Sequence, residues 1–311
     1  MMYIPVRLPG GEGAARLPFR LGIVAFMAYP ELLKSDEGAA ERILSLAGDP
    51  AFDLIEIGPV GGGEWRRAEE GLSRLHPRPS IALGLQPEIL VRGVNPSSLD
   101  ERERGEAENR LRGLVSEACR RGYEAVSLCS GPNLEGDARR RAFDSMEQTL
   151  AALAGEAAKC GMPVYLETFD TDVDKRRLVG RLGEAAELVE RVRGSGLKNV
   201  YLLWDLSHAP LLGEKPEDLR DYYDLVGHIH IGAAKSVDGR LYDWHPPFYR
   251  PGAVNDERDV ARLLKVLVEV GYRGAVSFEI RPEEGQRLEE AIGSSKEALA
   301  RGFRLLVEGR V

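Results

Sequence analysis

The sequence predicts a single (β/α)8 barrel, the TIM-barrel architecture, as one domain over residues 1–311. Three observations support this fold class. Eight short apolar segments rich in β-branched residues alternate with longer amphipathic segments, at spacings of about 25 to 50 residues. A chain of 311 residues suits one large hydrophobic core, and no shift in composition marks a linker.

The eight expected strands are almost continuously apolar, which is typical of parallel strands covered by helices. They lie at residues 21–27, 52–57, 80–85, 124–129, 163–167, 200–205, 225–231 and 275–280. The expected helices lie at residues 36–47, 64–75, 99–121, 138–160, 175–193, 216–224, 255–270 and 286–308. Residues 1–19 carry Gly and Pro without a clear period and are interpreted as an N-terminal lead-in. A doubly wound open sheet is the alternative, disfavoured because no GxGxxG follows the first strand.

The composition excludes several kinds of partner. Lys and Arg total 42 against 50 Asp and Glu, a net charge of −8, and no basic run alternates with aromatic residues, so nucleic acid is not an expected partner. The apolar runs fall far short of the roughly 20 residues of a membrane span. Cys119, Cys129 and Cys160 form no CxxC pair, and no secretory signal is seen, so we expect reduced thiols in a cytoplasmic protein. A homo-oligomer is compatible with the sequence but not required by it.

Ionisable residues end four consecutive expected strands. Glu167, Asp205, His230 and Glu279 stand at or near the ends of the fifth to eighth strands, which meet at one end of a barrel. Side chains alternate along a strand, so these four converge if they face the interior. Three crowded carboxylates repel one another unless a divalent cation neutralises them. The sequence therefore predicts a metal site formed by these four residues.

Each of these residues also has an ordinary structural interpretation. A Glu at a strand end is often solvated or ion-paired. Asp205 is able to cap the turn at Ser207 or His208, and His228 is interpreted as a hydrogen-bonded core residue rather than a ligand. The coincidence at four successive strand ends favours the metal.

A second group of possible ligands lies nearby. Four of the five histidines fall within residues 208–245, and His208, Asp243 and His245 together offer two nitrogens and a carboxylate, a set suited to Zn²⁺ or Mn²⁺. In the other interpretation His208 contacts a substrate oxygen, and the long aromatic loop at 232–254 forms a lid. One ion is therefore expected, and two are possible.

These motifs resemble the xylose-isomerase-like TIM-barrel superfamily from about Gly22 to Arg301. The resemblance is carried by the Glu ending the fifth strand, the DxxH after the sixth, the His of the seventh, the DxH loop and the last Glu. The stretches FMAYP, LETFDTDVDKRRLVG, DLSHAPLL and FEIRP resemble a sugar phosphate isomerase/epimerase branch, which is related to ketose 3-epimerases and endonuclease IV.

The resemblance implies a metal-dependent isomerase or epimerase of a sugar or sugar-like polyol or keto compound. In the ketose 3-epimerases the corresponding Glu, Asp, His and Glu bind one divalent ion (Mn, Zn, Co or Mg), and the two Glu exchange a proton next to a carbonyl through a metal-stabilised enediolate. Carried over, Glu167 and Glu279 are catalytic and His208 contacts a sugar or sugar phosphate. The chain departs from these enzymes at Ser236, where they carry Arg; Lys235 is the neighbouring candidate.

Two other functions in the superfamily are weighed. Endonuclease IV, a zinc-dependent phosphodiesterase, carries further histidines on its third and fourth strands, and the corresponding segments here, SIALGLQPEIL and AVSLCSGPN, contain none. An inosose dehydratase-like lyase remains open because dehydration begins with the same proton abstraction.

Further residues are candidate substrate contacts. Arg281 lies two residues beyond Glu279 and is expected to bind a phosphate or carboxylate, or else to pair with Glu283 or Glu284 on the surface. The other candidates, for sugar hydroxyls or for covering a sugar ring, are Glu56, Gln86, Trp204, Trp244 and Phe248.

Overall fold

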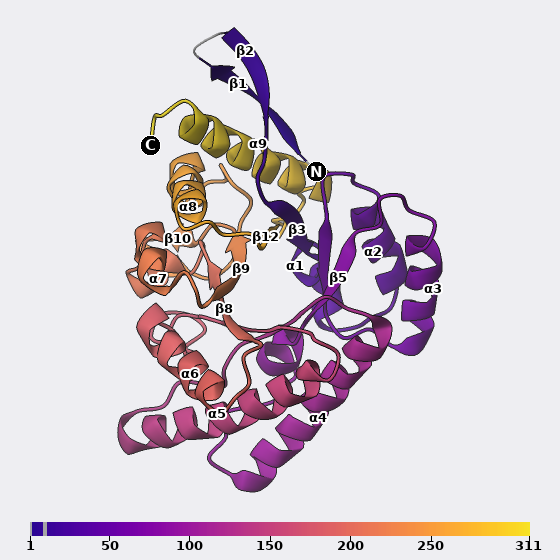
Figure 1. The fold of residues 1–311 in the computed structure, drawn as a ribbon, viewed down its shortest axis with the longest axis vertical. Coiled ribbons are helices and arrows are strands. Elements are labelled where there is room, and N and C mark those ends of the chain that lie inside the picture. The colour runs from indigo at the N-terminus through magenta and orange to yellow at the C-terminus, as the bar shows by residue number, and fades with distance from the viewer. Residues whose placement is uncertain (1, 9–10) are drawn as a thin grey trace.

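The computed structural model describes residues 2–8 and 11–311, and its centre is a closed barrel of eight parallel strands, which confirms the predicted fold class (Figure 1). The strands follow one another around the barrel in chain order, and the last pairs with the first. They are β3 Arg20–Val24, β4 Leu54–Ile57, β5 Ser80–Gly84, β6 Val126–Leu128, β7 Val164–Glu167, β8 Val200–Asp205, β9 Val226–Ile231 and β12 Ala275–Phe278.

Helices surround the barrel in the order of the chain, as Figure 1 shows. The longer ones are α2 Ala39–Ala47, α3 Gly62–Leu72, α4 Glu101–Arg121, α5 Gly136–Ala158, α6 Leu182–Gly194, α8 Glu257–Glu269 and α9 Leu288–Val307. Shorter turns are α1 Ala25–Ala28, η1 Pro30–Leu33, the π-helical η2 Pro87–Val91, α7 Ala209–Leu212 and the 3₁₀ helix η3 Pro216–Tyr222.

Two boundaries differ from the sequence prediction for a local reason. The first barrel strand ends at Val24, because residues 25–28 already form α1. The helix expected at 175–193 begins only at Leu182. The segment that precedes this helix is held as a loop, because the buried Asp170 carboxylate accepts hydrogen bonds from the backbone N–H groups of residues 173–175.

Two segments expected to be irregular contain β-hairpins. In the N-terminal lead-in, β1 Tyr3–Leu8 pairs antiparallel with β2 Gly11–Arg16, and the hairpin extends beyond α9 in Figure 1. Buried Ile4 and Val6 of β1 anchor it to the body of the protein. In the long loop after β9, β10 Lys235–Val237 pairs with β11 Arg240–Tyr242.

The prediction that all three cysteines stay reduced is wrong. Cys119 and Cys160 form a disulfide with a Cα–Cα distance of 5.8 Å, and only Cys129 remains a buried free thiol. Cys119 lies in the last turn of α4 and Cys160 just after α5, two helices that pack side by side. The pairing is set by helix packing, which a search for short cysteine spacings does not detect.

Loss of this disulfide is expected to destabilise the protein. The bond closes a loop with a sequence separation of 41, for which the chain-entropy relation gives about 4 kcal/mol. We predict that Cys119→Ser lowers the free energy of unfolding by about 3–4 kcal/mol in a denaturant titration, and that the oxidised, denatured wild type exposes a single thiol to a thiol reagent. Three reactive thiols without reductant would contradict the pairing.

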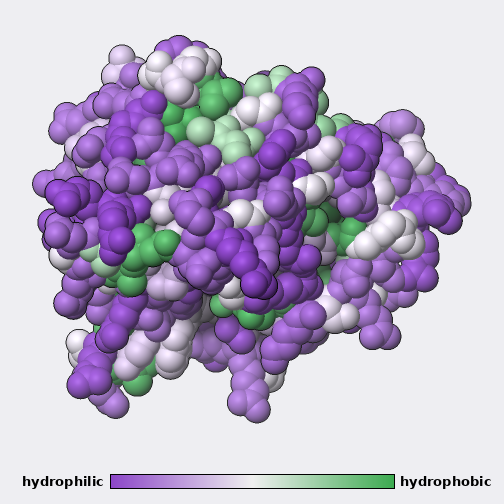
Figure 2. Space-filling model, turned by 90° about the horizontal axis from the view of Figure 1, so that it is seen from below, coloured by the Kyte–Doolittle hydropathy of each residue, from purple (hydrophilic) through white to green (hydrophobic). Residues whose placement is uncertain are grey.

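The described residues include no helix that is both long and apolar enough to cross a membrane. The face drawn in Figure 2 is mostly hydrophilic, with hydrophobic residues gathered only in small separate areas.

The barrel interior changes from apolar to polar along its axis. Leu54, Ala82 and Ala275 form an apolar layer with Tyr165 at the amino-terminal end of the strands. One side-chain layer further along, His228 Nε2 donates to Glu56 Oε1 at 2.8 Å and lies 3.3 Å from Ser277 Oγ. The buried polar side chains of the next layer lie at the carboxyl ends of the strands, where a barrel carries its functional site.

Candidate metal centre

Four buried side chains converge at the carboxyl end of the barrel. One ligand atom from each of Glu167, Asp205, His230 and Glu279 lies within 4.8 Å of every other. The first two end β7 and β8, His230 lies on β9, and Glu279 directly follows β12. All four point inward because side chains alternate along these strands, so the convergence expected from the sequence is present.

The contacts inside this group leave oxygen atoms free for a cation. His230 Nδ1 lies 2.6 Å from Glu279 Oε2 and 3.7 Å from Glu167 Oε1. Among the described residues, Glu167 Oε1 and Asp205 Oδ2 are buried with no hydrogen-bond partner. Unpartnered buried carboxylate oxygens are unfavourable without a counter-charge, so the donor set of three carboxylates and one imidazole fits a divalent ion.

The electrostatics of the group show an excess of buried negative charge. Burial is the largest cause and raises the pKa of Asp205 against the opposing charges of His208 and His245. Burial alone would lower the pKa of His230, yet the nearby carboxylates raise it well above its usual value. In the same way Glu279 and Asp243 outweigh burial and raise the pKa of His245 to about 9. The site thus attracts positive charge.

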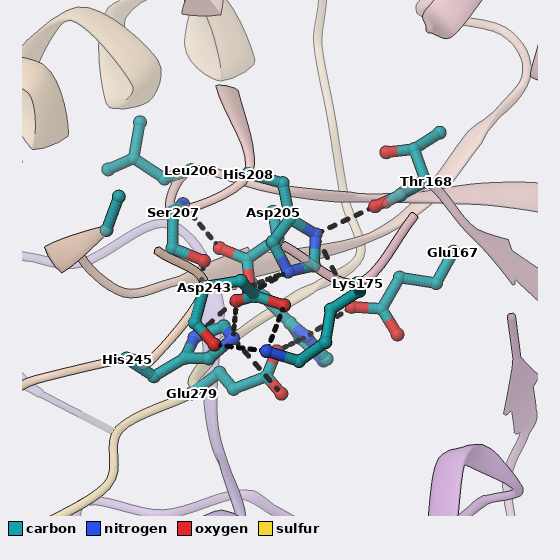
Figure 3. A network of polar contacts seen from close by, with 12 residues as sticks. Glu167, Thr168, Lys175, Asp205, Leu206, Ser207, His208, Asp243, His245 and Glu279 are labelled. Carbon is teal, nitrogen blue, oxygen red and sulfur yellow. Dashed lines mark hydrogen bonds and ion pairs between the residues drawn. The ribbon is translucent and has the colours of Figure 1, made fainter. Parts of the chain in front are cut away.

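The structure brings the residues of the second predicted group together. Asp243 Oδ1 lies 2.6 Å from His245 Nε2 and 3.2 Å from His208 Nε2. The same two histidines also form a possible ligand set with Asp205. Asp243 is in addition close to Lys175, whose Nζ lies 3.5 Å from Oδ2 and donates to the Asp243 backbone oxygen at 2.6 Å. Figure 3 shows the Lys175 side chain extending toward Asp243 and His245.

Both histidines of this group are held by the protein. His208 Nδ1 lies 2.7 Å from the backbone oxygen of Thr168, and His245 Nδ1 lies 3.2 Å from Ser207 Oγ. Asp205 Oδ1 accepts from Ser207 N at 2.6 Å, so the expected turn cap exists beside the free Oδ2. Gly232 allows this close packing, since a Cβ there would lie 2.6 Å from the backbone oxygen of Glu279.

Glu56 and His228 lie beneath the four-residue group and support it. His230 Nε2 is 3.2 Å from Glu56 Oε2, and Glu56 Oε1 is 2.8 Å from His228 Nε2. Burial works to raise the pKa of Glu56, but the two imidazoles outweigh it and lower the pKa well below its usual value. Glu56 therefore contacts His230 from below and is absent from the lining of the cavity above, unlike the sugar contact expected from the sequence.

A cavity of about 200 Å³ opens above the group. Of the four converging residues, Glu279 lines the cavity directly. Gln86 also lines the cavity and donates to Glu167 Oε2 at 2.7 Å. Its apolar wall is formed by Phe26, Met27, Leu33, Leu90, Val91, Phe169 and Trp244, and its cationic lining by Lys175, Arg177 and Arg281.

The remaining candidate residues separate into two sets. Trp244 and Arg281 line the cavity. Trp204 is fully buried and donates to Glu214, and Phe248 is buried in the core, so neither covers this cavity. Lys235 pairs with Glu283 at 2.5 Å and lines a neighbouring surface pocket.

Sequence reasoning missed Lys175 and Arg177, which reach the cavity from the loop after β7. The available signal was the run of basic residues at 175–177 shortly after Glu167. It was assigned to the start of a helix, where basic residues are unremarkable.

A model of the xylose isomerase-like TIM barrel family matches residues 51–302. The chain belongs to this family. A comparison with curated protein sequences gives no significant match.

Several solved structures have a similar fold and align with most of this chain. They include a D-tagatose 3-epimerase-like protein, with a TM-score of 0.70 and 21% identity over 94% of this chain and 100% of that one. An L-ribulose 3-epimerase has a TM-score of 0.66 and 20% identity over 94% and 95% of the two chains. The IOLI protein with a bound zinc atom has a TM-score of 0.66 and 20% identity over 94% and 99%.

Proposed function

We propose that this protein is a divalent-metal-dependent epimerase or isomerase acting on a sugar or sugar-like keto compound. The observation that carries the proposal is the buried convergence of Glu167, Asp205, His230 and Glu279 at the carboxyl end of the barrel, beneath a cavity. Folds similar to that of a D-tagatose 3-epimerase-like protein and of a zinc-bound protein support it.

In this proposal the four side chains hold the ion, and two of them also move a proton. A bound divalent ion would supply Lewis-acid stabilisation to the carbonyl and hydroxyl oxygens that gain negative charge. Glu167 and Glu279 are the acid and base: one takes the proton from the carbon beside the carbonyl and the other returns a proton. Gln86 orients Glu167 through its 2.7 Å hydrogen bond, leaving Oε1 free.

We further propose that one ion suffices. The Lys175 ammonium lies beside Asp243 and supplies a fixed positive charge where a second ion would otherwise balance that carboxylate. A single ion favours proton transfer over hydride shift, and hence epimerisation or an enediolate-type isomerisation. His208, with Nδ1 held by the Thr168 backbone oxygen and Nε2 3.2 Å from Asp243 Oδ1, lies beside the cluster and is proposed to contact a substrate oxygen there.

The experiment is solvent deuterium uptake into a panel of ketoses and related keto compounds. We expect incorporation at the carbon next to the carbonyl, abolished by EDTA and restored by Mn²⁺, Co²⁺, Zn²⁺ or Mg²⁺. Cleavage of an abasic DNA duplex with no exchange on any keto compound would favour an endonuclease IV-like phosphodiesterase instead. Loss of water from the exchanged compound would favour a lyase.

Glu56 is expected to act on metal affinity through His230. Its carboxylate accepts from His230 Nε2, so Nδ1, which faces Glu279 in the metal-free protein, is the nitrogen that would lose its proton and coordinate an ion. Removing such a partner typically weakens metal binding by about 10–100-fold, so Glu56→Gln should raise the Kd for Mn²⁺ by that factor in a chelator competition. The matched control is Glu124→Gln, which also removes one negative charge but at a carboxylate that pairs with Arg20, and it should leave the Kd for Mn²⁺ unchanged. Equal affinities of wild type and Glu56→Gln would refute this role.

A further inference from the structure

The loop after β7 is fixed by one buried carboxylate. Asp170 Oδ1 accepts from the backbone N of Val173 and of Asp174, each at 2.7 Å, and Oδ2 accepts from Lys175 N at 2.7 Å. The backbone N of Arg177 donates to the Asp170 backbone oxygen at 2.7 Å. The loop therefore has a defined shape that does not depend on a ligand.

This loop is also joined to the loop that carries Asp243. Asp243 N donates to Asp174 Oδ2 at 2.9 Å, and Lys175 Nζ donates to the same carboxylate at 2.9 Å as well as to the Asp243 backbone oxygen. The charge of Lys175 is thus already balanced within the protein. Arg177, two residues further on, lines the cavity, and no acid among the described residues forms an ion pair with it.

Two guanidinium groups, those of Arg177 and Arg281, line the cavity without an ion pair to a carboxylate of the described residues. Arg177 Nε is buried with no hydrogen-bond partner among the described residues. Arg281 is fixed at its backbone, where N donates to the His245 oxygen at 2.7 Å. Within residues 2–8 and 11–311, no ion pair joins either side chain to an acid, and the nearby Glu283 is occupied by Lys235 and Arg250.

The chemistry of this lining indicates the class of ligand. The partly buried guanidinium of Arg177 is unfavourable without a counter-charge, whereas Arg281 is exposed. The planar N–H donors of both groups match the oxygens of a carboxylate or phosphate. The cavity of about 200 Å³ has an apolar wall for carbon-bound hydrogens, and Glu279 lies in the same cavity as the two arginines.

We propose that the substrate carries an acidic group, a carboxylate or a phosphate, bound by Arg177 and Arg281 of the cavity lining while the reacting carbon faces Glu279. This inference rests on the proposed function for the reacting half of the molecule. It makes the substrate a sugar acid or a sugar phosphate rather than a neutral sugar.

The test compares deuterium uptake into matched compounds: a neutral ketohexose or ketopentose, its terminal phosphate, and the keto sugar acid with a terminal carboxylate. We expect one anionic form to exceed the neutral form in kcat/KM by about 100-fold, which identifies the acidic group. Arg177→Gln and Arg281→Gln should each lower kcat/KM for that anionic form about 10–100-fold, mainly through KM, and should lower the ratio of kcat/KM between the anionic and the neutral form by a similar factor. Arg176→Gln, an exposed neighbour outside the cavity, is the matched control and should change neither.

A binding measurement separates this inference from the proposed reaction. Inorganic phosphate should bind the EDTA-treated wild type in calorimetry and bind at least tenfold more weakly to Arg281→Gln, an exposed position where the substitution leaves the core intact. If this holds while no keto compound exchanges deuterium, the reaction is wrong and the acidic-group site stands. If neutral sugars exchange as efficiently as anionic ones, the acidic-group site is wrong and the reaction stands. If phosphate binds wild type and variants equally, the acidic-group site is wrong, and the deuterium exchange alone decides the reaction.

Discussion

Glu167→Gln is expected to abolish proton exchange while leaving the barrel folded. The amide keeps an acceptor oxygen for Gln86 Nε2, which lies 2.7 Å from Glu167 Oε2 in the wild type, so the local packing is preserved. What is lost is a carboxylate able to take a proton, together with one charged ligand atom for the ion. General acid–base groups contribute about 10²–10⁴-fold, and loss of the ligand adds to this, so we expect kcat to fall at least 10⁴-fold.

The measurement is deuterium uptake at saturating Mn²⁺, with thermal unfolding as the test of folding. Glu279→Gln should behave in the same way, because the proposed reaction uses the two carboxylates as acid and base in turn. Asp172→Asn, an exposed change in the loop after the same strand, is the matched control and should retain full activity. Retention of more than a tenth of the wild-type rate in Glu167→Gln would eliminate this residue as acid or base.

The second large effect is expected at Asp205. Its Oδ1 accepts from Ser207 N at 2.6 Å, a bond that asparagine can keep, whereas the buried Oδ2 has no partner among the described residues. Burial raises the pKa of this carboxyl, so the charged form is unfavourable without a cation. Asp205→Asn should therefore weaken Mn²⁺ binding by more than the roughly 10–100-fold typical of a residue outside the ligand set.

Thermal unfolding with and without Mn²⁺ measures this effect. An ion present at about 1,000 times its Kd stabilises the folded protein by about 4 kcal/mol, and in Asp205→Asn this gain should fall to about 1.4 kcal/mol or less, because a Kd raised about 100-fold or more leaves the ion at no more than about ten times the new Kd. The metal-free variant should be at least as stable as the metal-free wild type, because a buried charge has been removed. An unchanged gain in stability on adding Mn²⁺ would show that Asp205 is not a ligand.

The fold was predictable because its main signal is local. Segments such as 200–205 and 275–280 are apolar and short, and their alternation with amphipathic helices repeats eight times. The convergence of Glu167, Asp205, His230 and Glu279 followed from two general properties: parallel strands end at one rim, and side chains alternate along each strand.

The features that were not predictable depend on contacts between distant segments. The pairing of Cys119 with Cys160 depends on the packing of α4 against α5. The position of Lys175 depends on the hydrogen bond that its backbone N–H donates to the side-chain carboxylate of Asp170. Likewise Glu56 lies under His230 instead of at the cavity because its place on β4 is one side-chain layer below the rim, and a strand boundary read from sequence does not fix that layer.

The most direct test of the central claim is a crystal structure with Mn²⁺, in which anomalous scattering locates the ion. We predict one strong peak bound by Glu167, Asp205, His230 and Glu279, with Lys175 still beside Asp243. A peak coordinated without both glutamates, or no bound ion at millimolar Mn²⁺, would contradict the account.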